Sequence, residues 1–169
     1  METPMEIERR FLVARPAPGE LTGEPAYTES EIEQVYLPGA PGVTHRIRRR
    51  TTGGCTVCTE TVKIRIDRMS CREDEHEITP DRYRELMSAR DPAAQILRKT
   101  RLTFRRDGQT YEIDLYPFWK HTAMLECELP DRDAPLSFPP CLTVLREVTG
   151  DFRLSNASLA RHPVPEEEL

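Results

Sequence analysis

The sequence contains no run of about 18 apolar residues, the length that a membrane-spanning helix needs. Its first residues also lack the basic segment and following apolar segment of a secretory signal peptide. These absences predict a cytoplasmic protein that contacts no membrane. No period of about 20 to 50 residues repeats along the chain, which excludes solenoid and propeller folds. A length of 169 residues favours one domain over two.

Positive charge is in deficit across the whole chain. The formal net charge is −5 and the sequence pI is about 5.5, which argues against a general nucleic-acid binder. Any anion that the protein binds must therefore contact a local basic patch. Apolar residues make up 37% of the chain and charged residues 31%, a balance that predicts a partly charged interior.

Cysteine is scarce and odd in number. The five cysteines and the missing secretory signal argue against a disulfide framework. Cys55 and Cys58 have the spacing of half a zinc site, but no second paired motif completes it. The spacing gives structural zinc little support and leaves the role of this pair open.

Alternation between apolar and polar residues is the dominant pattern, and it predicts a mainly antiparallel β domain with a few helices. In the first strand, expected over 5–13, Glu6, Glu8 and Arg10 share one face. A solvated strand face often carries charge, so this row alone does not indicate a site. Further strands are expected at 31–37, 43–51, 57–68, 72–78, 94–106, 110–117 and 122–130.

Turn and helix signals separate these strands. Gly53-Gly54 and Asp107-Gly108 are hairpin signals. Thr79 followed by proline is typical of a helix start, and that helix should end before Asp91-Pro92. Apolar residues at helical spacing also predict a short helix over 141–149.

The expected strand over 57–68 shows the two faces clearly. Val62, Ile64 and Ile66 lie on one face, which we expect to be buried, and Lys63 and Arg65 lie on the other. The strand is therefore half-buried and cationic on its second face.

The charged faces of the later strands are segregated by sign. The basic rows are Arg46 with Arg48, Lys63 with Arg65, and Lys99 with Arg101; the acidic rows are Glu75 with Glu77, Glu112 with Asp114, and Glu126 with Glu128. Like charges two residues apart repel unless opposite charge lies between them. A closed barrel resolves this conflict, because its interior can surround a ligand while helices and loops cover its apolar outer face.

A barrel interior with both basic and acidic rows is suited to binding a polyanion together with metal ions. The basic rows would bind a polyanion, and the acidic rows would bind divalent cations that bridge it. Mg²⁺ and Mn²⁺ prefer carboxylate oxygens and keep waters or substrate phosphates as further ligands. The pattern predicts metal-assisted phosphoryl transfer.

Glu6-Ile7-Glu8-Arg9-Arg10, followed by Phe-Leu-Val, resembles the opening Glu-x-Glu-x-Lys motif of the CYTH superfamily, also called triphosphate tunnel metalloenzymes. Nearly the whole chain shares the resemblance, because further motifs follow in the family's order. They are Gln34–Leu37, Arg46–Arg48, Thr61–Lys63, Glu75–Glu77, Lys99–Arg101, Asp114, Glu126–Glu128 and Glu147–Asp151.

The resemblance implies a closed eight-stranded antiparallel barrel that forms a tunnel, with a few helices packed outside. This single tunnel domain is expected to span residues 1–160. The proline- and glutamate-rich segment 161–169 is expected to be a frayed C-terminal tail.

Motif position also implies roles for individual residues. The implied triphosphate ligands are Arg10, Arg46, Arg48, Lys63, Lys99 and Arg101. The implied metal-binding carboxylates are Glu6, Glu8, Asp114, Glu126 and Glu128, and all of these except Asp114 would also be catalytic. Secondary candidates are Glu75, Glu77, Arg72 and Tyr36.

Two positions depart from the family pattern. Arg10 stands where the family usually has lysine, and arginine offers phosphate a planar fork but cannot donate a proton at neutral pH. Arg72 sits one residue further from Glu75 than the family spacing, which gives it the wrong parity unless a bulge intervenes.

The expected function is Mg²⁺- or Mn²⁺-dependent hydrolysis of a triphosphate, with inorganic tripolyphosphate giving pyrophosphate and phosphate. Relatives hydrolyse thiamine triphosphate or cyclise ATP, so both activities are alternatives in the same tunnel. A non-catalytic sensor of polyphosphate or a nucleotide is a third, which the carboxylates disfavour because without metal they would repel the ligand. The substrate, the preferred metal and the choice between monomer and homodimer stay open.

Overall fold

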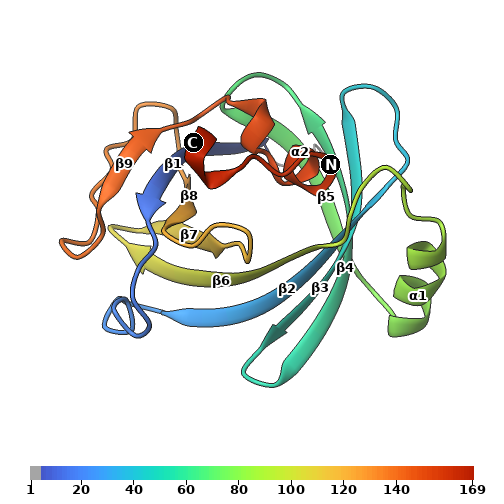
Figure 1. Ribbon diagram of the computed structural model, residues 1–169, viewed down its shortest axis with the longest axis horizontal. Helices are drawn as coiled ribbons and strands as arrows, with labels where there is room; N and C mark the ends of the chain where they lie inside the picture. Colours follow the sequence, from blue (N-terminus) through green and yellow to red (C-terminus); the bar gives the residue numbers. More distant parts are fainter. Residues whose placement is uncertain (1–4) are drawn as a thin grey trace.

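The computed structural model describes residues 5–169 and shows one antiparallel sheet that closes into a barrel (Figure 1). Residues 1–4 of the predicted domain lie outside the described residues. The strands are β1 Met5–Ala14, β2 Thr28–Leu37, β3 Val43–Thr52, β4 Cys55–Arg65, β5 Ser70–Ile78, β6 Leu97–Arg106, β7 Gln109–Leu115, β8 Thr122–Glu128 and β9 Val144–Glu147. The helices are α1 Pro80–Ser88 and α2 Asn156–Arg161, and 3₁₀ turns occupy Phe152–Leu154 and Glu166–Glu168.

The strand order is β5-β4-β3-β2-β6-β7-β8-β1-β9, and a further pairing of β1 with β5 closes the ring. Eight strands therefore form the barrel, and β9 is an extra strand beside β1. This confirms the predicted eight-stranded antiparallel barrel. No helix in the described part of the chain is long and apolar enough to cross a membrane.

Local sequence signals explain the connections. Gly53 and Gly54 have φ of 55° and 81°, and Asp107 and Gly108 have φ of 51° and 77°. Positive φ at both central residues is the requirement of the two-residue hairpin turn that matches strand twist. Both predicted hairpins are thus confirmed.

Helix α1 begins as the sequence predicts. The Thr79 hydroxyl accepts a hydrogen bond from the Arg82 backbone N–H at 3.1 Å, and Pro80 occupies the first helical position. The helix ends at Ser88, before Asp91. It lies on the outside of the barrel (Figure 1).

The outer face of the barrel is covered unevenly. Tyr83 and Leu86 of α1 pack on Val35, Ile47 and Cys58. A second outer core forms where the loops before β2 and β9 cover β1 and β6–β8, and Leu125 at its centre is fully buried.

The apolar face of β4 departs from its prediction. Ile64 and Ile66 are each 48% exposed, so the expectation that they are buried is wrong. Helix α1 packs near Cys58, at the opposite end of the same strand.

The segment predicted as a helix over 141–149 is instead extended. Val144 pairs with Val13 of β1, and Glu147 pairs with Phe11. The same edge of β1 is occupied by β5 only from Met5 to Ile7, so the rest of that edge would have unpaired backbone groups. Strand β9 satisfies them, and this requirement outweighs the helical spacing.

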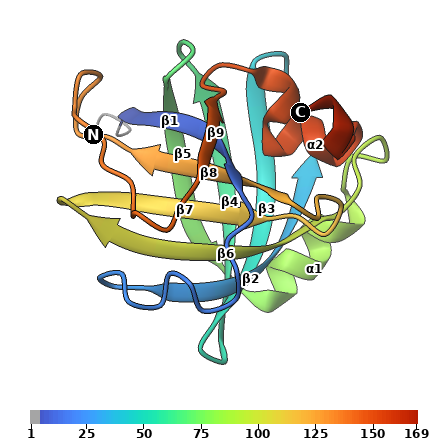
Figure 2. The same cartoon turned by 60° about the vertical axis from the view of Figure 1, so that its left-hand side comes forward.

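Inside the barrel, one end is apolar. Leu12 of β1 and Met124 of β8 point inward and pack with Tyr116, and Leu154 and Leu159 of the C-terminal segment join the same cluster. Helix α2 lies at this end of the barrel (Figure 2). The C-terminal segment therefore plugs one end of the barrel.

The last residues differ from the predicted frayed tail. The Trp119 ring N–H donates to the Val164 carbonyl at 2.9 Å. The Glu166 carboxylate accepts hydrogen bonds from the backbone N–H groups of Lys120 and His121 at 2.9 and 2.6 Å. These contacts hold the segment 161–169 against the loop between β7 and β8.

Candidate active site

The polar part of the barrel interior forms a cavity of about 260 Å³. Strands β1–β8 contribute side chains that alternate inward, and the C-terminal segment adds residues at one side. Most of the lining side chains are charged, so the interior is partly ionic, as the composition predicts.

The cavity collects most of the sequence-predicted site residues. Those that line it are Glu6, Glu8, Arg10, Tyr36, Arg46, Arg48, Lys63, Glu75, Arg101, Glu126 and Glu128. Lys99 and Asp114 are buried beside the cavity and do not line it. Glu77 and Arg72 do not line it either, and Arg72 is exposed opposite Met5 and Ile64.

Several lining residues were absent from the predicted set. Glu73 alternates with Glu75, and Glu112 with Asp114, so alternation could have identified both. Arg65 shares the row of Lys63 in the same way. Arg68 and the lining residues of segment 150–157 carry no such signal, because they come from a loop and the C-terminal plug.

Strands β1 and β8 place their charged rows face to face. Arg10 is opposite Glu126, and Arg10 Nε lies 3.2 Å from Glu126 Oε1. The Arg10 guanidinium also donates to the Leu154 carbonyl at 2.6 Å, which ties the C-terminal plug to this row. Glu8 is opposite Glu128, and within residues 5–169 neither makes an ion pair.

These two carboxylates are electrostatically unfavourable as they stand. Burial, reinforced by the negative charge of Glu126, raises the pKa of Glu8. Burial and the charge of Glu112 likewise raise the pKa of Glu128. Lys63, Arg10 and Arg101 offset the charge of Glu8 only in part, and Arg101 offsets that of Glu128 only in part.

Asp114 is the opposite case, because three nitrogens surround it. Its carboxylate accepts from Lys99 Nζ at 2.5 Å, from Arg101 Nε at 2.6 Å and from Arg101 Nη2 at 2.8 Å. Although burial opposes it, the charges of Arg101 and Lys99 lower the pKa of Asp114 well below its ordinary value. The Asp114 carboxylate fixes the position of Arg101, whose Nη2 also reaches Glu126 at 3.2 Å.

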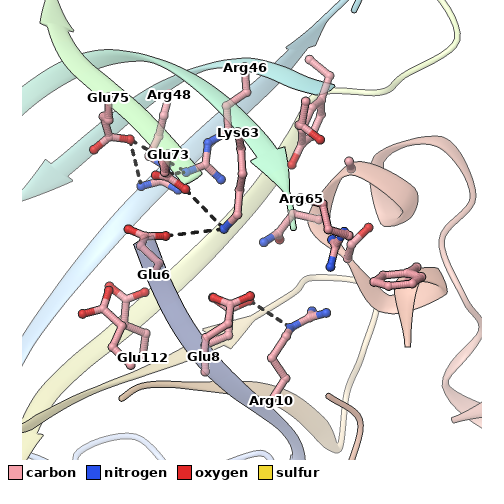
Figure 3. A pocket seen from close by; sticks show the side chains of 18 of the residues that line it. Glu6, Glu8, Arg10, Arg46, Arg48, Lys63, Arg65, Glu73, Glu75 and Glu112 are labelled. Carbon is pink, nitrogen blue, oxygen red and sulfur yellow. Dashed lines mark hydrogen bonds and ion pairs between the residues drawn. The ribbon is translucent and has the colours of Figure 1, made fainter. Parts of the chain in front are cut away.

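A second chain of ion pairs crosses from β1 to β3 (Figure 3). Lys63 Nζ lies 3.7 Å from Glu6 and 3.3 Å from Glu73, and Arg46 Nη2 lies 3.2 Å from Glu73. Arg46 and Arg48 also approach Glu75, at 3.8 and 4.0 Å. The basic rows therefore point into the same space as the acidic rows.

Two buried guanidinium donors of the described chain make no hydrogen bond in this space, although Arg10 Nε lies at ion-pair distance from Glu126. Within residues 5–169, Arg10 Nε and Arg46 Nε make no hydrogen bond. Buried polar groups are normally paired, so orphaned guanidinium donors at a cavity fit an anionic ligand that supplies the acceptors.

The donor set also fits a divalent cation. Glu8 and Glu128 offer carboxylate oxygens without competing cations, and hard cations such as Mg²⁺ and Mn²⁺ prefer such ligands. Ligand atoms of Glu6, Cys71 and Glu73 also lie within 4.8 Å of one another. Strand β1 therefore contributes a carboxylate to each of the two candidate cation sites, Glu8 to the first and Glu6 to the second.

Aromatic side chains contribute little to the cavity wall. Trp119 and Tyr116 are 1% and 0% exposed and pack against each other within the apolar plug, so Trp119 is a packing residue. Tyr36 does line the cavity, and its hydroxyl accepts a hydrogen bond from the Gln34 amide.

The chain was compared with protein families, curated proteins and solved structures. No family model and no curated protein matches the chain. The inorganic triphosphatase NE1496 is 29% identical to it, with 98% of each chain covered and a TM-score of 0.58. The PH1819 protein of Pyrococcus horikoshii OT3 is 19% identical over 76% of this chain and 80% of its own, with a TM-score of 0.59.

A third similar structure is the putative adenylyl cyclase HpAC1 from Hippeastrum, whose description states a dominant triphosphatase activity. It is 17% identical over 74% of this chain and 80% of its own, with a TM-score of 0.52. At this identity the similarity shows the barrel fold alone. The similarity to NE1496 covers nearly the whole of both chains.

Proposed function

We propose that this chain, which belongs to the CYTH superfamily of triphosphate tunnel metalloenzymes, hydrolyses inorganic tripolyphosphate to pyrophosphate and phosphate. One observation carries the proposal. Cationic rows and carboxylates without cation partners face each other across one cavity. That combination suits a polyanion bound together with a divalent metal, and it suits neither an apolar ligand nor a bare anion.

The cationic residues would bind the phosphates. Arg46, Arg48 and Lys63 approach the cavity from one wall, and Arg10 and Arg101 approach it from the other. Arginine binds phosphate oxygens in a bidentate fork. Within residues 5–169, Arg46 Nε makes no hydrogen bond and Arg10 Nε makes only an ion pair with Glu126, so both can donate to phosphate. An arginine at position 10 therefore suits phosphate binding.

The carboxylates would hold Mg²⁺ or Mn²⁺, with Glu8 and Glu128 as the first ligands and Glu6 and Glu126 beside them. Such an ion, when bound, supplies charge neutralisation at the phosphate oxygens. In the reaction, the oxygen of a water molecule bonds to a terminal phosphorus while the bridging P–O bond breaks. The electron pair of that bond leaves with pyrophosphate, and the proton lost by the water passes to a product oxygen or to solvent. The role of the arginines is to stabilise the charge on the transferred and leaving groups.

Asp114 contributes to this mechanism by positioning. It is fully buried and clamps Arg101 through two hydrogen bonds, so the guanidinium points at the cavity in a fixed orientation. Preorganised cations of this kind stabilise a transition state without reorganising at the moment of reaction.

An organic triphosphate is the competing substrate class. Thiamine triphosphate or ATP would add a ring that needs an apolar or aromatic wall, and Tyr36 and Phe152 are the aromatic residues that line the cavity. The mostly charged lining favours the inorganic substrate.

The test measures phosphate release from tripolyphosphate, thiamine triphosphate and ATP, each with Mg²⁺, with Mn²⁺ and with EDTA. We expect the fastest metal-dependent release from tripolyphosphate. Glu8→Gln should abolish it without unfolding the protein, because Glu8 makes no ion pair within residues 5–169. Glu31→Gln, on an exposed position of β2, is the matched control.

Full activity in Glu8→Gln would refute the assignment of the carboxylates. Tight binding of tripolyphosphate without turnover under every metal condition would refute hydrolysis and favour a sensor.

A further inference from the structure

On one side of the cavity, the arginine side chains have no carboxylate partner among the described residues. Arg65, at the end of β4, and Arg68, in the following turn, line the cavity together with Phe152 and Gly150 of the C-terminal segment. Figure 3 shows Arg65 set apart from the cluster of Glu6, Glu73 and Lys63. We call the four residues 65, 68, 150 and 152 the mouth cluster.

Contacts with the C-terminal segment hold both guanidinium groups. The Arg65 guanidinium carbon lies 4.1 Å from the centre of the Phe152 ring. Arg68 lies directly on Gly150, where a Cβ atom would come within 2.6 Å of Arg68 Nε. Gly150 also has φ of +79°, so both the backbone and the close approach require glycine.

Within residues 5–169, neither Arg65 nor Arg68 makes an ion pair with a carboxylate. The contrast with Arg46, Lys63 and Arg101 is clear, because each of those contacts at least one glutamate. The mouth cluster therefore presents two positive charges without an ion-pair partner in residues 5–169, beside a cavity that other cationic side chains already line.

We propose that the mouth cluster is a subsite for the fourth phosphate of a linear polyphosphate, so that the substrate class extends beyond tripolyphosphate. This inference rests on the proposed binding of three phosphates in the cavity. In a chain of four or more phosphates, the fourth phosphate carries negative charge beyond the three that the cavity would bind. Arg65 and Arg68 would donate hydrogen bonds to that phosphate.

A nucleoside or another aromatic group fits the mouth cluster less well. Phe152 is 45% exposed, but the Arg65 guanidinium already covers one face of its ring. An uncharged ring bound there would leave the Arg65 and Arg68 charges unmatched, whereas phosphate would neutralise them.

The experiment compares equilibrium binding of tripolyphosphate and tetrapolyphosphate by calorimetry, with Ca²⁺ as the divalent cation. Phosphate release is measured in the same samples to confirm that both polyphosphates stay intact. The variants are Arg65→Gln, Arg68→Gln and the control Arg90→Gln, which removes the same charge from an exposed residue outside the cavity. We expect wild type to bind tetrapolyphosphate at least fivefold more tightly than tripolyphosphate. Arg65→Gln and Arg68→Gln should each reduce that preference about fivefold at low salt, and Arg90→Gln should leave it unchanged.

The outcomes separate this inference from the proposed function. Equal wild-type affinity for the two polyphosphates, or an unchanged preference in both mouth variants, would overturn the subsite even if tripolyphosphate is hydrolysed. A preference that both variants lose would support the subsite even if no hydrolysis occurs. Stronger loss of ATP binding than of tetrapolyphosphate binding in Phe152→Leu would assign the mouth to an organic group instead.

Discussion

Asp114→Asn should destabilise the metal-free protein strongly. The side chain keeps its size but loses its charge, so Lys99 loses its carboxylate partner and Arg101 keeps, within residues 5–169, only Glu112 and Glu126. Burial already lowers the pKa of Lys99 to about 7, so the larger part of the cost falls on Arg101. Lys99 and Asp114 side chains are both 0% exposed, and the Arg101 side chain is 5% exposed, so water cannot replace the lost partner.

The magnitude follows from this burial. Removing one partner of a buried ion pair typically costs about 3 to 5 kcal/mol, because the remaining charge stays desolvated. For a chain of this length, that free energy corresponds to a fall in Tm of roughly 6 to 20 °C. Glu8→Gln is the informative contrast, because burial and Glu126 raise the pKa of Glu8, so its charged form disfavours the folded state.

The assay is urea unfolding of both variants at pH 7 in EDTA, followed by tryptophan fluorescence and circular dichroism. Asp114→Asn should lose stability, and Glu8→Gln should match or exceed wild type. The reasoning would be refuted if Asp114→Asn were as stable as wild type in EDTA. That result would mean that the carboxylate mainly repels its acidic neighbours and waits for a metal.

Three further predictions concern regions outside the cavity. Although desolvation opposes them, hydrogen bonds from the Lys120 and His121 backbone N–H groups lower the pKa of Glu166 from 4.5 to about 2. Its stabilising contribution is therefore complete above pH 4.5 and is lost as the pH falls towards 2, so Glu166→Gln should weaken the acid dependence of urea unfolding between these values. Leu125→Ala, at a fully buried position, should cost about 2 to 5 kcal/mol in the same assay. Leu145→Ala, at a position 54% exposed, should change stability by less than about 0.5 kcal/mol.

Sequence reasoning succeeded where strand alternation alone decides the answer. Glu6, Glu8 and Arg10 must share a face in any extended strand, and closure of the barrel turns that face inward. The rows of a single sign also pointed to a closed barrel, because a basic row inside a barrel needs an acidic row across the interior. The barrel and most of the cavity lining followed from these rows.

Position along the barrel axis was harder to predict, because it depends on register. Glu73, Glu75 and Glu77 share one parity, and only pairing with β4 distinguishes them. Glu73 is opposite Lys63, which lines the cavity, whereas Glu77 is opposite Thr59, which does not. Glu73 therefore lines the cavity and Glu77 does not. No local signal in the sequence determines that register.

Interactions distant in sequence account for the other differences. The segment 141–149 has helical spacing of apolar residues, but the open edge of β1 makes it a strand. The exposed Ile64 and Ile66 have the alternation of a buried face, yet helix α1 covers the opposite end of β4, near Cys58. In both cases tertiary contacts override a correct local pattern.

The position of β1 in the sheet has a consequence for how the chain folds. Strands β2–β5 and β6–β8 are consecutive hairpins, whereas β1 must pair with β8, for example Glu8 with Glu128. The first strand synthesised therefore waits for the last barrel strand, and such distant pairings slow folding. Until then β5 and β8 are open edges that other chains can pair with. Closure removes both edges and assembles the charged interior in one step, so an intermediate lacking β1 is at once prone to aggregation and unable to bind a polyphosphate.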